Sequence, residues 1–479
     1  MTFLFARRRK ERLAQQRQVI THFDAVTDEQ AYPKVVTQLP MYNEHGVAAR
    51  VIEAAAAIDY PRSRHEIQVL DDSTDETREL VDQTVERLRG EGVRVSVIRR
   101  ADRTGFKAGA LQEGLRHTDA ELIAIFDADF VPPPDFLRKA VAFFVQRREL
   151  GLVQGRWTHL NRSASMLTRG QAIGIDGHFV IEQAARTWNN LFMNFNGTAG
   201  VFRREAIESS GGWQHDTLTE DLDLSYRMQL NGWKTEYVPD LVVPAEIPED
   251  VNGFKNQQFR WAKGSIQTAR KVLPRLFAAG VHPFRLLQAL LHLTYYVVHP
   301  FVLTVALLTA PVLSIVNKCE MPLLLLPVLL GMGLSTFGPS IMYMTAQHTL
   351  GNRGTTKFLL IPIMMFIGVG LAVNNTWAVA EALIGRVSPF HRTPKKGQAR
   401  STNYRPIKDA TCIVELAVGV YCMLAFRHFF MTASLLVTPF LLIYSAGFLF
   451  IGLLSIIHYH RPDTIDWRVP RPRFARAAA

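Results

Sequence analysis

Two regions of very different polarity most constrain what this chain can fold into. Residues 30–280 are mixed in polarity and interrupted by turn-forming residues, whereas residues 285–458 are dominated by long apolar runs. A bilayer core of about 30 Å requires about 20 apolar residues in a helix. The sequence therefore predicts a soluble domain joined to a bundle of membrane helices.

The apolar region predicts four membrane crossings arranged as two hairpins. Residues 287–316 and 322–346 form the first hairpin, and residues 410–426 and 433–457 form the second. The segment between them, residues 358–383, has basic flanks on both sides, and basic flanks stay on the cytoplasmic side of a membrane. We therefore expect this segment to be re-entrant or interfacial. Five crossings with one basic loop outside is the alternative.

Basic residues exceed acidic ones, with 54 Lys and Arg against 43 Asp and Glu and a net charge of +11. They cluster at residues 7–17, 386–408 and 468–476, and no nucleic-acid motif accompanies them. The charge therefore indicates a cytoplasmic membrane face rather than a nucleic-acid partner. The basic N-terminal segment is expected to stay in the cytoplasm and lie on the membrane surface. The three cysteines lie in or beside apolar runs, so neither a disulfide framework nor a zinc site is expected.

Short β-branched runs alternate with helical patterns from residue 34 onward, which predicts βαβ units and a mostly parallel sheet. The predicted strands are residues 34–39, 66–70, 94–98, 122–126 and 151–154, and the predicted helices are residues 47–58, 76–89, 106–117 and 134–147. Several strands run into polar or acidic residues at their C-terminal ends, the edge where ligands bind in open α/β sheets.

Acidic residues follow two of these strands. Asp127 and Asp129 come after an apolar run, and carboxylates two residues apart on a strand share one face. Hard oxygen ligands of this kind suit Mg²⁺ or Mn²⁺ holding a diphosphate, and a pair of turn aspartates is the alternative. Asp71, Asp72 and Asp75 form a second cluster, in which one acid is expected to be structural, with Asp75 suited to cap the next helix.

Two helical motifs complete the candidate site. Thr219, Glu220 and Asp221 precede a helix, where Asp221 could act as a general base or as an ordinary helix-terminal acid. Gln257, Arg260 and Trp261 share one face of an amphipathic helix. They offer an amide, a guanidinium for phosphate oxygens and an indole for a sugar ring, or else they only anchor an interfacial helix.

In combination these motifs are far more specific than alone. The chain resembles the processive family-two membrane glycosyltransferases, the group of cellulose synthase and the cellulose-synthase-like mannan synthases. The resemblance covers residues 33–410 and is carried by the sequences QLPMYNE at 38–44, QVLDDSTD at 68–75, KAGAL at 107–111, IFDADF at 125–130 and FNGTAG at 195–200. It implies a GT-A-type nucleotide-sugar domain with a transmembrane bundle and amphipathic interface helices.

The resemblance also implies residue roles. Asp221, with Glu220 and Thr219, becomes the catalytic set. The residues implied to bind the donor are Asp71, Asp72, Lys107, Asp127, Gln257, Arg260, Thr393 and Lys395. The residues implied to bind the acceptor are Asn196, Gly197, Thr198 and Trp261. Asp127 and Asp129 are implied to hold Mg²⁺ or Mn²⁺. Thr393 and Lys395 belong to a loop similar to the gating loop of cellulose synthase, from which it departs at Arg392. Asn196 stands where cellulose synthases carry Cys, which leaves the transferred sugar open.

The implied function is an inverting, processive transfer from a nucleotide-sugar donor, GDP-mannose or UDP-glucose, to a β-linked polysaccharide that the bundle exports. A non-processive enzyme that moves one sugar to a lipid is the alternative.

The expected location is an inner or plasma membrane, with several crossings and a cytoplasmic catalytic domain; the oligomeric state is not predicted. The expected division is a basic segment (1–30), a GT-A domain (31–250), an interface helix with QxxRW (251–284), a hairpin (285–346), a re-entrant segment with the gating loop (347–409), a second hairpin (410–458) and a cytosolic tail (459–479).

Overall fold

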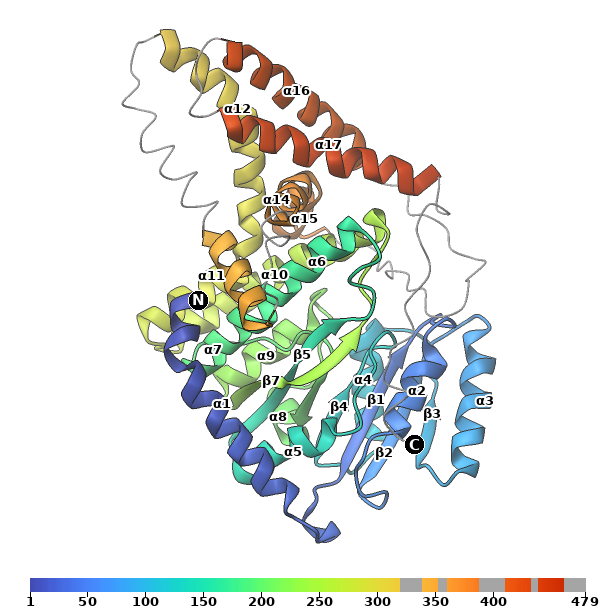
Figure 1. Cartoon of the computed structure of the whole chain (residues 1–479). Helices are drawn as coiled ribbons and strands as arrows, with labels where there is room; N and C mark the ends of the chain where they lie inside the picture. The colour runs from blue at the N-terminus through green and yellow to red at the C-terminus, as the bar shows by residue number, and fades with distance from the viewer. Residues whose placement is uncertain (319–337, 352–359, 387–409, 432–437, 461–479) are drawn as a thin grey trace.

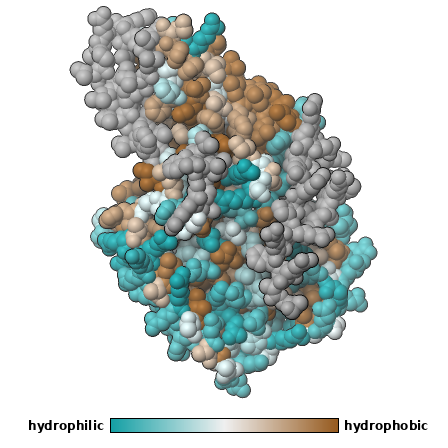
Figure 2. Space-filling model, in the orientation of Figure 1, coloured by the Kyte–Doolittle hydropathy of each residue, from teal (hydrophilic) through white to brown (hydrophobic). Residues whose placement is uncertain are grey.

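The computed structural model divides into a mixed α/β domain and a group of long helices that extends away from it (Figure 1). It describes residues 1–318, 338–351, 360–386, 410–431 and 438–460. The gating-loop residues Thr393 and Lys395 and most of residues 322–346 lie outside the described residues. Figure 2 shows hydrophobic side chains gathered over the helical end and hydrophilic ones over the α/β domain. The predicted division of the chain by polarity is therefore visible on the surface.

The α/β domain is built on a seven-stranded mixed sheet with the order β3-β2-β1-β4-β6-β5-β7. The strands are β1 (Val35–Met41), β2 (His65–Asp71), β3 (Val95–Ile98), β4 (Leu122–Ile125), β5 (Leu150–His159), β6 (Gly200–Arg203) and β7 (Lys234–Ala245). Strand β6 is antiparallel to both of its neighbours, and the remaining pairings are parallel. The expectation of a mostly parallel sheet is confirmed.

Helices cover both faces of the sheet, which is why the central strands are apolar on both sides. Strand β4 alternates between two cores: Leu122 and Ala124 pack on one side, and Ile123 and Ile125 on the other. The first core takes helices α2 (Ala48–Ala56), α3 (Thr77–Gly90) and α5 (Phe136–Gln146). The second takes α4 (Phe106–Arg116), α7 (Ala184–Trp188), α8 (Arg204–Ser209) and α9 (Glu220–Leu230), with the π-helical turn η2 (Gly177–Gln183) that follows α6 (Met166–Asp176).

The basic N-terminal segment forms helix α1 (Thr2–Asp24), which runs along the outside of the α/β domain (Figure 1). Phe5 stacks on Trp188 with ring centroids 5.6 Å apart. Arg12 pairs with the buried Glu236 carboxylate at 3.0 Å. One face of this segment is therefore held by protein, and its contact with a membrane surface stays a prediction.

The helix that carries QxxRW is α10 (Val251–Ala278), longer than the predicted amphipathic segment. It is not simply interfacial, because it packs against α9 on one side and against α15 (Ala372–Ile384) and α17 (Thr438–His460) on the other. Its Lys255 and Lys263 side chains are almost fully buried. The amphipathic pattern reflects burial between two parts of the protein rather than between protein and lipid alone.

Three described helices are long and apolar enough to cross a membrane: residues Tyr295–Ile315, Thr411–Met431 and Thr438–His460. Residues 287–293 belong to a separate helix, α11 (Pro283–Leu293), because the helix ends at Thr294 before α12 (Val298–Lys318) begins. The predicted first crossing therefore starts too early. The predicted re-entrant segment is a pair of helices, α14 (Leu360–Gly370) and α15, bent by 43°, a geometry that fits a broken span or a re-entrant loop.

Buried ion pairs join α10 to the membrane helices. Lys255 contacts Glu415 of α16 (Thr411–Met431) at 2.6 Å, and Lys263 contacts Glu381 of α15 at 2.8 Å. The Glu415 carboxylate is fully buried where it contacts Lys255. Both pairs connect the α/β domain to the helical part through one helix.

We expect Glu415→Gln to destabilise the protein by about 3–5 kcal/mol, because it removes a buried carboxylate charge that lies 2.6 Å from the buried Lys255 ammonium. Thermal unfolding of the detergent-solubilised protein measures this loss. The double variant Lys255→Met with Glu415→Leu should recover most of it, since both charges are then removed. Glu86→Gln, at an exposed position of α3, is the control. Equal melting of all variants would show that the pair contributes nothing.

Candidate active site

A cavity of about 870 Å³ lies at the C-terminal ends of β1, β2 and β4. Its wall contains most of the predicted site residues: Asp72, Lys107, Asp127, Asp129, Asn196, Gly197, Thr219, Glu220, Asp221, Gln257, Arg260 and Trp261. Of the predicted site residues that the structure describes, two are absent from the wall, Asp71 and Thr198, and both are buried. Segments more than 180 positions apart in the sequence thus meet at one place, as the combination of motifs predicted.

The acid cluster after β2 separates into three roles. Asp71 is structural: one carboxylate oxygen accepts the Ser73 N–H at 3.0 Å, and the other pairs with Arg99 at 2.8 Å. Asp75 accepts the Thr77 N–H at 3.0 Å, but the N-cap residue of α3 is Glu76, so Asp75 supports the start of this helix from one residue before the cap position. Only Asp72 reaches the cavity, and the Arg100 guanidinium holds its carboxylate. The donor-binding expectation for Asp71 is therefore not supported by its position.

The aspartates after β4 lie in a turn, not on the strand. The strand ends at Ile125, so the same-face argument from strand geometry was wrong, although Asp127 and Asp129 both line the cavity. Lys107, near the start of α4, pairs with the Asp127 carboxylate and donates to the Gly197 carbonyl at 2.7 Å. The buried Thr198 hydroxyl accepts the Asp127 N–H at 2.8 Å, so Thr198 positions Asp127 instead of facing an acceptor.

The donor set around Asp127 and Asp129 fits a divalent cation that shares ligands with a bound diphosphate. Both side chains supply hard carboxylate oxygens, the ligand type that Mg²⁺ and Mn²⁺ prefer. Among the described residues, no group of three or more His, Cys, Asp or Glu side chains could hold a metal ion alone. A cation bound here therefore requires further oxygens from substrate and water, as Mg²⁺ sites commonly do.

The Thr219-Glu220-Asp221 motif lies where helix α9 begins, with Asp221 in its first turn. Burial, followed by the neighbouring Glu220 carboxylate, raises the pKa of Asp221 to about 7. Burial also raises the pKa of Glu220, although Lys107 opposes that shift. A carboxyl group with a pKa near neutrality is suited to accept a proton from a hydroxyl group.

Gly197 allows the backbone to approach Asp221. A Cβ atom at this position would lie 3.3 Å from an Asp221 carboxylate oxygen and 3.6 Å from the Lys107 ammonium, and the residue has φ +84°. Both the space and the left-handed backbone favour glycine. This contact places the Asn196-Gly197 loop directly beside the two charged groups.

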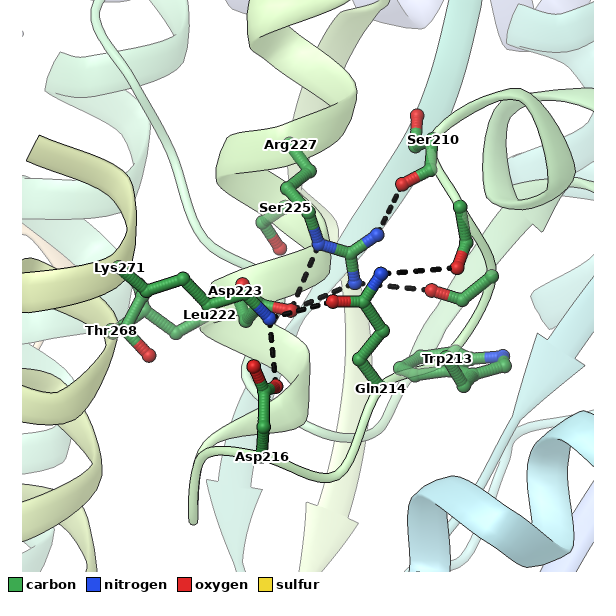
Figure 3. Close-up of polar contacts among 12 residues, drawn as sticks. Ser210, Trp213, Gln214, Asp216, Leu222, Asp223, Ser225, Arg227, Thr268 and Lys271 are labelled. Carbon is green, nitrogen blue, oxygen red and sulfur yellow. Dashed lines mark hydrogen bonds and ion pairs between the residues drawn. The ribbon is translucent and has the colours of Figure 1, made fainter. Parts of the chain in front are cut away.

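A buried ionic network fixes α9 against α10 (Figure 3). Asp223, two residues after Asp221, pairs with Arg227 at 2.8 Å and with Lys271 of α10 at 3.1 Å. Lys271 also contacts Asp216 at 2.7 Å, and Asp216 belongs to the loop that lines the cavity. The position of Asp221 is therefore set by ion pairs to its own helix, to α10 and to the cavity loop.

Helix α10 presents Gln257, Arg260 and Trp261 to the cavity, as the spacing predicted. Burial lowers the pKa of the Arg260 guanidinium, and the Glu220 and Asp127 carboxylates oppose that shift. A guanidinium remains charged in any protein environment. Arg260 therefore supplies a positive charge to the cavity, within electrostatic range of the Glu220 and Asp127 carboxylates.

Sequence reasoning missed several cavity residues. The Arg103 guanidinium lies 3.2 Å from the centroid of the Tyr42 ring. Glu246 pairs with Arg50 at 2.6 Å and follows directly after β7. An acid at the end of a strand was the available signal for Glu246, but β7 was not among the predicted strands. The Arg103 contact had no sequence signal, because it depends on loop geometry.

Comparison with known proteins gives matches along most of the chain. A family model described as "Glycosyltransferase like family 2" matches residues 33–264. Probable glucomannan 4-beta-mannosyltransferase 15 of Arabidopsis thaliana is 32% identical over 451 residues, which cover 90% of this chain and 80% of that protein. Glucomannan 4-beta-mannosyltransferase 7 of the same plant is 46% identical over 246 residues, which are 50% of this chain but only 44% of that protein.

A solved structure, mannosyltransferase PcManGT from Pyrobaculum calidifontis in complex with GDP-Man and Mn2+, is 19% identical with a TM-score of 0.49. It covers 80% of this chain and 98% of its own. That likeness is too low to support an argument about ligands.

The mixed sheet, with its acids at the carboxyl edge and helices on both faces, defines a GT-A-type nucleotide-sugar domain, as the sequence predicted. The chain belongs to glycosyltransferase family 2, the family that also contains the plant glucomannan mannosyltransferases it matches.

Proposed function

We propose that this protein transfers a hexosyl group from a nucleoside-diphosphate sugar to a hydroxyl group of a growing β-linked polysaccharide, with inversion at the anomeric carbon. The proposed donors are GDP-mannose and UDP-glucose. The observation that carries the proposal is the Asp221 carboxyl group, whose pKa is raised to about 7 in a cavity that also contains Lys107 and Arg260. The same cavity thus offers a proton acceptor and positive charge.

In this proposal Asp221 removes the proton from the acceptor hydroxyl as its oxygen attacks the anomeric carbon. The bond from that carbon to the diphosphate breaks, and its electron pair leaves with the diphosphate. Arg260 stabilises the charge that develops on the departing group. Because the attack comes from the face opposite the leaving group, an α-linked donor gives a β-linked product.

Donor and acceptor would occupy opposite ends of the cavity. Asp72 is proposed to contact the nucleotide, and Lys107 to position Asp127 beside the diphosphate. Asp127 and Asp129 would hold a divalent cation, which would neutralise diphosphate charge when bound. Trp261 is proposed to stack on the terminal sugar, with Asn196 and Gly197 nearby in the wall.

Processive extension and export form the second part of the proposal. Helix α10 carries the acceptor-side Trp261 and packs directly on α15 and α17, so a product leaving the cavity would lie next to the membrane helices. The basic segments beside the apolar runs support a cytoplasmic catalytic domain in an inner or plasma membrane with several crossings. A non-processive transfer to a lipid acceptor is the alternative.

One experiment tests the proposal. The purified membrane protein is supplied with single nucleotide sugars and Mg²⁺ or Mn²⁺, nucleotide release is measured, and the product is digested with linkage-specific hydrolases. A polymer that resists lipid extraction and yields to a β-specific hydrolase is the expected result. A product of one sugar in the lipid phase would favour the alternative, and the absence of nucleotide release with every donor would overturn both.

Chelation with EDTA should remove nucleotide release, and added Mn²⁺ or Mg²⁺ should restore it. Asp129→Asn should raise the metal concentration required for half-maximal release, since it replaces one anionic ligand with a neutral amide. Asp119→Asn, at an exposed position whose carboxylate contacts only Lys34 among the described residues, should behave as the wild-type protein. Full activity in EDTA would show that transfer needs no exchangeable metal.

A further inference from the structure

Side chains of the π-helical turn η2 form hydrogen bonds with Asn196, a residue of the cavity wall. π-helical turns are rare and occur often at functional sites, because the extra residue in the turn re-aims its side chains. Here three side chains of η2, His178, Glu182 and Gln183, form a connected set with Asn196. Of these residues, Asn196 lines the cavity, so η2 acts on the cavity through Asn196.

Hydrogen bonding fixes the orientation of the Asn196 amide. Gln183 Nε2 donates to the Asn194 carbonyl at 2.8 Å, so the same nitrogen must also donate to Asn196, whose Oδ1 accepts. The Asn196 Nδ2 therefore faces His178 Nε2, at 3.0 Å. The Asn196 backbone N–H donates to Gln154 Oε1 at 3.1 Å, which fixes the main chain as well.

The same contacts determine the protonation of His178. Its Nε2 accepts from Asn196, so the ring proton lies on Nδ1 and is donated to Glu182 Oε2 at 3.0 Å. Burial would raise the pKa of Glu182, but Arg186, 2.8 Å away, and His178 lower it well below its ordinary value. The Glu182 carboxylate is thus a charged acceptor that selects this tautomer of His178.

We infer that His178, oriented by Glu182, is a positioning residue that holds Asn196 as a hydrogen-bond donor to a hydroxyl group of the acceptor sugar. This inference rests on the proposed function. One Nδ2 hydrogen of Asn196 is used by His178, and within the described ranges the structure gives the other no partner. The next residue, Gly197, lies against Asp221, so the amide is close to the group that takes the acceptor proton.

A matched pair of substitutions separates positioning from packing. The amide of glutamine reaches the place of the imidazole Nε2, whereas the amide of asparagine reaches the place of Nδ1. His178→Gln thus keeps an acceptor for Asn196, and His178→Asn keeps only the contact with Glu182. Both variants are neutral and polar.

The measurement uses GDP-mannose or UDP-glucose, whichever the wild-type protein turns over, with short β-1,4-linked mannan or glucan oligosaccharides as acceptors. We expect His178→Asn to lower kcat/KM for the acceptor about tenfold, the effect of one hydrogen bond, with the KM for the donor unchanged. His178→Gln should stay close to the wild-type value. Equal acceptor kinetics in the two variants, or a parallel change in the donor KM, would overturn the inference.

The wild-type protein distinguishes this result from a failure of the proposed function. If the wild-type protein releases no nucleotide with any donor, the proposed function is wrong, and the inference about His178 is then wrong as well. If it is active and the two variants are alike, only the inference is wrong.

Discussion

Replacing Asp221 with Asn is expected to lower the rate of sugar transfer at least a thousandfold while donor binding persists. The carboxylate is the proposed proton acceptor, and the amide has no comparable basicity, so the loss should appear in kcat. Donor binding should persist because Lys107, Asp127 and Arg260 are unchanged. Nucleotide release and nucleotide-sugar binding to the purified protein measure the two quantities separately.

The pH dependence provides an independent check of this assignment. The base must be ionised, and the pKa of Asp221 is about 7, so kcat/KM should rise with pH through about 7. The sign is opposite for stability. A carboxyl group whose pKa is raised by folding favours the folded state most at low pH, and that contribution is lost as pH rises through about 7. Asp221→Asn should therefore not lower the melting temperature at pH 8, and normal polymer yield from it would overturn the assignment.

Arg260→Gln is expected to lower kcat by about two to three orders of magnitude. The substitution removes a buried positive charge from the wall where the departing diphosphate lies, and loss of one such stabilising group costs rates of this size. Arg260→Lys should recover part of the rate, since it restores the charge but not the planar pair of donors. Single-turnover release of nucleotide follows the chemical step directly.

Arg275→Gln is the matched control for this result. Arg275 lies on the same helix, in its last turn, but is exposed and is not part of the cavity wall. It should show wild-type kinetics. If Arg260→Gln changed only the KM for the acceptor, the diphosphate role would be wrong.

Local sequence patterns predicted the first half of the sheet. Strand β4 is wholly apolar, and β1 and β2 each contain a short apolar run that leads into polar or acidic residues, so these strands were visible in the sequence. Strand β6 was not predicted, because Gly200–Arg203 is short and its pairing with β4 and β5 is non-local. Strand β7 includes Pro239 and Pro244 and was not predicted. Strand β5 was predicted only over residues 151–154, and its pairing register shifts after that segment, between Gly155 and Arg156.

The candidate site was predicted more fully by residue type than by geometry. The sequence motifs correctly predicted that Asp127, Asp221 and Arg260 line one cavity. They did not predict that Asp71 pairs with Arg99, or that the Thr198 hydroxyl accepts the Asp127 N–H. Those roles depend on which side chain turns inward, and spacing alone does not determine this. The hydrogen bond between His178 and Asn196 could not be predicted from the sequence either, because it depends on a π-helical turn.

Helix α10 links the α/β domain to the membrane helices through two buried ion pairs, so the stability of each part depends on the other. The cavity residues Arg260 and Trp261 lie on the same helix as Lys255 and Lys263, which pair with carboxylates of α16 and α15. A fragment cut after α10 would keep every cavity residue of that helix but strip both ammonium groups of their carboxylates. Exchange of catalytic domains between relatives must therefore carry α15 and α16 along, and the transmembrane helices act as part of the enzyme's folding unit as well as its anchor.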